Sequence, residues 1–174
     1  MTSTTTSVSP TTVGLRYGLI TGLVITAVSF LQLALISDPE TPLRWLSGVV
    51  LGVGIVLAHK RFKQLNGGFM SYGEGLGIGA VLAAVAGLLS SFFSFLYLKF
   101  VDPDYMNRVM ELTRSRLEDR GMEGAQVDQA IASIAKYSTG PISIVFGALG
   151  ALLLGFFLTL AISAFTKHTR PEFE

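Results

Sequence analysis

Long apolar runs, separated by shorter polar segments, dominate the pattern along this chain. Four runs carry little or no charge, and they cover residues 14–36, 43–58, 76–98 and 142–165. The first contains 23 residues. At 1.5 Å per residue an α-helix of that length measures about 34 Å, which exceeds a hydrocarbon core of roughly 30 Å. The pattern therefore predicts an all-α fold, an integral membrane bundle of four transmembrane helices.

The second run is the shortest, with 16 residues and a charged residue, Arg44, near its start. A long arginine side chain can reach the interface, and the neighbouring Trp45 is a suitable interfacial anchor. We therefore expect 43–58 to span as well. Three spans with a buried half-span form the main alternative.

A different pattern covers residues 103–137, where charged residues are as frequent as in a soluble helix pair. Tyr105, Val109 and Leu112 recur at four- and three-residue steps, and charged residues occupy the positions between them. Gly121 suits the position just after a helix end, and a second helix is expected beyond it. We predict an extracytoplasmic amphipathic helical hairpin between helices three and four.

The membrane domain is expected to cover 14–168, with a disordered polar tail at 1–13 and a C-terminal tail at 169–174. The first apolar run is too long for the core of a signal peptide, so we expect it to be retained. Four spans place both termini on one side. The basic residues on that side lie close to the span ends, which predicts that both termini are cytoplasmic.

Composition supports a membrane protein and excludes several functional classes. Charged residues make up 14% of the chain, whereas a globular domain has about 25%. The absence of cysteine excludes disulfides and cysteine-ligated zinc. A net charge of +1 argues against nucleic-acid binding, which needs a concentrated basic face.

Glycines recur within each apolar run at spacings of four or eight residues. Helices in a bilayer associate through close van der Waals contact, which small residues permit. We predict packing seams inside the bundle, with homodimerisation through a spare seam as the alternative. The glycines predicted to pack are Gly14, Gly18, Gly22, Gly48, Gly52, Gly75, Gly79, Gly87, Gly147 and Gly155.

The predicted spans contain few groups that could react or bind an ion, because their centres have no ionisable residue. We expect no catalytic residue, metal site or cofactor, and we expect that the protein is not an enzyme. His59 and His168 flank basic helix ends and are interpreted as interfacial polar groups rather than ligands.

A few polar residues remain as candidate sites. Gln32 is the costliest polar group within a span. Ser90 and Ser94 are candidates to line a cleft, although aromatic packing explains their surroundings equally well. Glu74 is a candidate as a first-turn acid of helix three or as an ion-pair partner of a nearby basic residue.

Several short motifs resemble a known family. They are Arg16-Tyr17-Gly18 with Gly22, Lys60-Arg61 followed by Asn66-Gly67-Gly68, Met70-Ser71-Tyr72-Gly73-Glu74-Gly75, Asp102-Pro103-Asp104-Tyr105 and Gly121-Met122. Over about residues 14–168 the chain resembles the bacterial membrane-protein family catalogued as domain of unknown function four-one-nine-nine. The resemblance implies a four-helix inner-membrane protein with a helical segment between helices three and four. It implies no activity and no catalytic residues.

Two functions remain open. The first is a structural or interaction component of the bacterial inner membrane, with the lipid bilayer, other membrane proteins or a second copy of the chain as partners. The second is a small transporter or channel subunit, for which a polar cavity between the helices is the distinguishing feature.

Overall fold

A computed structural model of the protein describes residues 9–35 and 42–169. This part of the chain is helical, as predicted, and its one β-type pairing is an isolated bridge between Met70 and His168. The elements in chain order are α1 (Pro10–Leu35), the short 3-10 helix η1 (Pro42–Trp45), α2 (Leu46–Leu65), α3 (Tyr72–Phe100), α4 (Tyr105–Asp119), α5 (Gly124–Ser138) and α6 (Ile142–Thr166).

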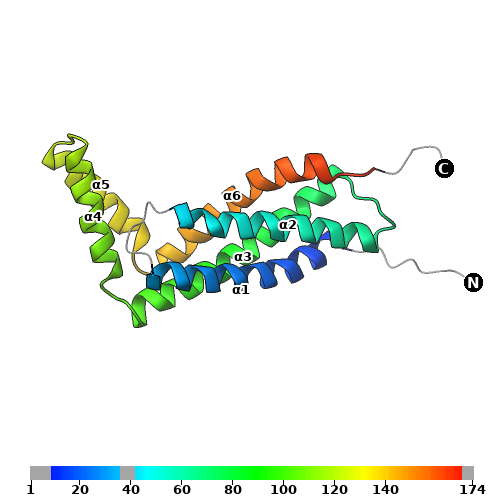
Figure 1. Cartoon of the computed structure of the whole chain (residues 1–174), viewed down its shortest axis with the longest axis horizontal. Coiled ribbons are helices and arrows are strands. Elements are labelled where there is room, and N and C mark those ends of the chain that lie inside the picture. Colours follow the sequence, from blue (N-terminus) through cyan, green and yellow to red (C-terminus); the bar gives the residue numbers. More distant parts are fainter. Residues whose placement is uncertain (1–8, 36–41, 170–174) are drawn as a thin grey trace, which may run out of the picture.

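Helices α1, α2, α3 and α6 lie side by side as a bundle, and α4 and α5 lie together at one end of it (Figure 1). Helix α3 is the central element, since it contacts α1 and α6 most extensively and also touches α2. Helix α1 begins and α6 ends at the end of the bundle opposite to α4 and α5 (Figure 1). The bundle therefore has two different ends, one carrying α4 and α5.

Within residues 9–35 and 42–169, three helices and not the expected four are long and apolar enough to cross a membrane: α1, α3 and α6. The prediction for 43–58 needs correction. Helix α2 starts later, at Leu46, and continues to Leu65, so that its last turns include Lys60, Arg61 and Lys63. These cations shorten its uninterrupted apolar stretch below the length of the other three helices.

Two helices begin earlier than the apolar runs predict. Helix α1 starts at Pro10 rather than at residue 14, because proline fits the first turn of a helix, where its missing N–H costs nothing. The last residues of the expected polar tail are therefore helical. The remainder of that tail, 1–8, and residues 170–174 of the C-terminal tail lie outside the described residues.

Helix α3 begins at Tyr72, before the predicted residue 76, because a capping box precedes it. The Glu74 backbone N–H donates to the Ser71 hydroxyl at 3.2 Å, and the Ser71 N–H donates to the Glu74 carboxylate at 2.7 Å. Together they satisfy two amide groups that a helix start leaves unpaired. Glu74 therefore acts as a first-turn acid in the structure.

Helix α4 ends two residues before a glycine that stops it, as the sequence indicates. Gly121 has a φ of +82°, its N–H donates to Glu118, and the next N–H, of Met122, donates to Leu117. This paired arrangement is the Schellman motif. It turns the chain into α5, which contacts α4 and is joined to it by an ion pair of 2.8 Å between Arg114 and Asp128.

Candidate functional site

The glycines of α1 bring its backbone against α3. A β-carbon added at Gly14 would lie 2.9 Å from the Ile78 carbonyl oxygen, and one added at Gly18 would lie 2.9 Å from the β-carbon of Val85. At Gly22 it would meet the α-carbon of Ala86 at 3.0 Å. Any larger residue on this face would push the two helices apart, as expected for a small-residue seam.

The predicted glycines of α3 and α6 lie in the interface between these two helices. An added β-carbon would meet Ser163 at Gly75, Thr159 at Gly79, Ala151 at Gly87, Ser91 at Gly147 and Ala83 at Gly155. Each of these contacts is closer than a real β-carbon tolerates.

The glycines of α2 behave differently. The nearest atom to a β-carbon on Gly48 is a methyl of Leu154 at 3.8 Å, and at Gly52 nothing lies within 4 Å. The close approach of α2 to α1 occurs instead at Gly54, which faces the buried side chain of Thr21. The spacing pattern missed Gly54 because it lies outside the four-residue series of Gly48 and Gly52.

At the end of the bundle away from α4 and α5, a histidine joins three helices. His59 is fully buried. Its Nε2 lies 3.0 Å from the carbonyl oxygen of Gly75 in α3, and its Nδ1 lies 2.9 Å from the Thr166 hydroxyl in α6. Because a carbonyl only accepts, Nε2 carries a proton. The Lys63 ammonium donates to the Thr166 carbonyl at 3.1 Å beside it.

The interpretation of His59 as an interfacial group overlooked its helical position. Ile55 and Phe62 lie four residues before and three residues after it, and both are fully buried. Residues at these spacings share one helix face. That periodicity was the available signal for a buried histidine. His168 is exposed and stacks on Phe69, with ring centroids 5.4 Å apart.

The other candidate polar residues occupy separate places. The Gln32 side chain donates to the carbonyl of Leu43, so it ties the end of α1 to the start of η1. Ser90 and Ser94 lie on α3 together, beside a cleft. Neither Gln32 nor Glu74 lines this cleft.

The cleft between α1, α3 and α6 has a volume of about 220 Å³ and a wall rich in hydroxyl groups. Its lining residues are Ser29, Ser90, Ser91, Ser94, Phe95, Leu98, Ser143 and Gly147. Ser29 and Ser143 lie far from α3 in sequence, so the α3 pattern alone could not place them here.

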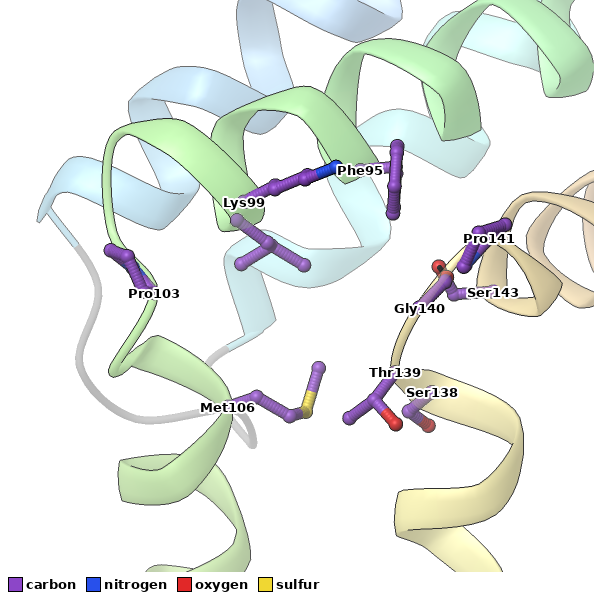
Figure 2. Close-up of a pocket in the computed structure, with 10 residues that line it drawn as sticks. Phe95, Lys99, Pro103, Met106, Ser138, Thr139, Gly140, Pro141 and Ser143 are labelled. Atoms are coloured by element: carbon purple, nitrogen blue, oxygen red, sulfur yellow. Dashed lines mark hydrogen bonds between the residues drawn. The ribbon is translucent and has the colours of Figure 1, made fainter.

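A second cavity of about 330 Å³ lies beside the cleft, where α3 ends and α6 begins (Figure 2). Phe95, Leu98 and Ser143 line both spaces. Its remaining walls are Lys99, Pro103, Met106, Ser138, Thr139, Gly140 and Pro141. Figure 2 shows Met106 from α4 and Thr139 from the α5–α6 connection facing each other below Phe95 and Lys99.

Lys99 is the charged residue of this cavity. Its ammonium lies 5.8 Å from the ring centroid of Phe95 and 5.4 Å from that of Phe100. Beside the cavity, Asp102 is instead paired with Arg108 at 2.5 Å, and this hydrogen bond raises the pKa of the Arg108 guanidinium above its usual value. Burial raises the pKa of the Tyr105 phenol.

Comparison with known proteins identifies the family. No curated protein and no solved structure matches the chain. A family described as "Protein of unknown function (DUF4199)" matches residues 16–168, most of the sequence, which confirms the resemblance carried by the short motifs. The chain therefore belongs to this family.

Proposed function

We propose that the protein is a non-enzymatic interaction component of the bacterial inner membrane, which binds other membrane proteins through α4 and α5. One observation carries this proposal. At eight of the ten glycines predicted to pack, an added β-carbon would lie 3.0 Å or less from an atom of another helix of the same chain. All the predicted seams except that of Gly48 and Gly52 are thus used inside the bundle, and we assign the surface for a partner to α4 and α5.

Several features of α4 and α5 support this proposal. Helix α4 has no fully buried residue, and α5 has one, Val127. Leu112 on α4 is 40% exposed among charged neighbours. An exposed ion pair between Arg114 and Asp128 links the two helices. Apolar residues surrounded by polar ones are typical of protein interfaces.

The proposed topology places α4 and α5 outside the cytoplasm as a hairpin, and both termini inside. In this proposed topology α2 also crosses the membrane, which is supported by its position along α1 and α6 within the bundle. The last turns of α2 contain Lys60, Arg61 and Lys63. They lie at the end of the bundle where α1 begins and α6 ends. Basic residues close to span ends favour the cytoplasmic side.

Photo-crosslinking in native membranes tests the docking surface. A photoreactive residue replaces Leu112, and in a matched control it replaces Gly52, which has open space around it on α2. We expect a discrete protein adduct from position 112 and lipid adducts from position 52. A protein adduct from position 52 alone would assign the interface to the remaining glycine seam. Lipid adducts from both positions would contradict the proposal.

A transporter or channel subunit is the second candidate, and the serine-lined cleft favours it. Serine side chains from α1, α3 and α6 line it, and their hydroxyl groups could contact a polar solute. Solute flux into liposomes should fall when Ser94→Ala removes a hydroxyl from the wall. It should be unchanged by Ser133→Ala, since Ser133 is exposed on α5. Equal flux in both variants would exclude the cleft as a pathway.

A further inference from the structure

The cavity beneath α4 combines an apolar wall with one cation. Its apolar wall includes Phe95, Leu98, Pro103 and Met106, and Lys99 lies at its rim (Figure 2). A volume of about 330 Å³ is at the lower end for small-molecule pockets, which measure roughly 300–1,000 Å³. Such a space accommodates one hydrocarbon chain rather than a folded peptide.

The charge at the rim has no protein counter-ion in the described part of the chain. The carboxylates nearest in sequence are Asp102, which is paired with Arg108, and Asp104. Lys99 contacts aromatic rings instead. An ammonium group that has no carboxylate partner among the described residues and lies next to an apolar cavity is complementary to an anionic amphiphile, because the ligand supplies both the charge and the hydrocarbon chain.

The start of α6 reinforces this positive end of the cavity. Pro141 and Ser143 belong to its wall. Helix α6 has 25 residues, no acid in its first turn and no side chain that caps its amide groups. The partial positive charge of a helix start therefore adds to that of Lys99.

We propose that this cavity binds one anionic phospholipid, with an acyl chain between α3, α4 and α6 and the phosphate at Lys99. The location selects a phospholipid over a water-soluble anion. Lys99 lies at the end of a membrane-crossing helix, and the neighbouring Phe100 and Val101 are 70% and 66% exposed, so lipid reaches the rim directly. This site requires membrane insertion but not the docking role of α4 and α5.

Native mass spectrometry of the full-length protein, purified in mild detergent, tests whether Lys99 selects an anionic headgroup. The protein is incubated with equal amounts of phosphatidylglycerol and phosphatidylcholine of identical chains. We expect one phosphatidylglycerol retained in preference, and Lys99→Gln should weaken its binding about fivefold, the effect of one basic residue at a membrane surface. The control, Lys136→Gln, removes a lysine of α5 that does not line the cavity and should change nothing.

A second pair of variants tests whether the cavity holds an acyl chain. Met106→Trp fills the cavity and should lower phosphatidylglycerol retention, whereas Met110→Trp, one turn further along α4 and not part of the wall, should not. Thermal unfolding of each variant shows whether it is folded. Equal retention in all four variants would overturn the proposal, as would equal binding of the two lipids. Preferential retention of added oleate over phosphatidylglycerol would overturn the assignment to a phospholipid.

Discussion

At the scale of single residues, glycines determine how closely α3 and α6 approach. Gly79 faces the Thr159 side chain, whereas Gly77, on the same helix, has nothing within 4 Å. We expect Gly79→Ala to lower the free energy of unfolding by about 1–3 kcal/mol, the usual cost of overpacking. Gly77→Ala should be neutral or stabilising by up to about 1 kcal/mol, because alanine favours helix. Thermal unfolding in detergent measures both.

Equal melting temperatures for the two glycine variants would show that α3 and α6 do not meet as described. The comparison isolates packing, because both positions lie within α3 and neither has a positive φ. The same side chain is therefore added twice to one helix, once against a neighbour and once into open space.

A buried histidine is the other residue on which the bundle depends. His59→Phe keeps a ring of similar size but leaves the carbonyl of Gly75 without its donor. A buried polar group that loses its partner costs about 1–3 kcal/mol, so we expect a lower melting temperature. His168→Phe is the control, since His168 is exposed and its bridge to Met70 uses backbone groups alone. If both substitutions had the same effect, the three-helix contact of His59 would be wrong.

At the scale of elements, the turn between α4 and α5 depends on backbone conformation. Gly121 has a φ of +82°, and a β-carbon there would meet no neighbouring atom. Gly121→Ala should therefore lower the free energy of unfolding by about 1–2 kcal/mol, because alanine disfavours this backbone conformation. Gly124→Ala, at the start of α5, has the same open space and no positive φ.

We expect Gly121→Ala to accelerate amide hydrogen exchange in α4 and α5, while Gly124→Ala leaves the exchange rates unchanged. Exchange in α3 and α6 should be the same in both variants, because the turn lies outside the bundle. Identical rates in α4 and α5 would indicate that the turn does not hold these helices together.

Most of the elements follow from hydrophobic periodicity, and their ends from local signals. Gly121 marked the end of α4 correctly. The early start of α3 was missed because its capping box consists of the polar residues Ser71 and Glu74, which lie before the apolar run. The length of α2 was misjudged because hydropathy ends at Ala58, whereas helical hydrogen bonding continues through the basic residues to Leu65.

The cavity could not be predicted in the same way. Its wall combines residues of α3, α4 and the α5–α6 connection, and no periodicity within one helix relates Lys99 to Met106 or Thr139. The glycine seams were accessible from sequence because each seam lies on one helix. The partner of each glycine was not, since that depends on the register between helices.

At the scale of the whole molecule, the two ends of the bundle differ. One end carries α4 and α5, and the other carries the basic end of α2 (Figure 1). The apolar cavity lies at the first of these ends. The proposed docking surface lies at the first end, and the proposed orientation in the membrane rests on the basic residues at the second. Both depend on α2 crossing the membrane with α1, α3 and α6, although it is less apolar than they are.

Cysteine labelling in intact cells tests this crossing most directly, because the chain has no cysteine of its own. Single cysteines replace Leu43 and Arg61, near the two ends of α2, and Leu112 on α4. A membrane-impermeant maleimide should label positions 43 and 112 in intact cells, and position 61 after permeabilisation alone. Labelling of 43 and 61 from the same side would contradict a crossing α2, and labelling of 61 but not 112 in intact cells would reverse the topology.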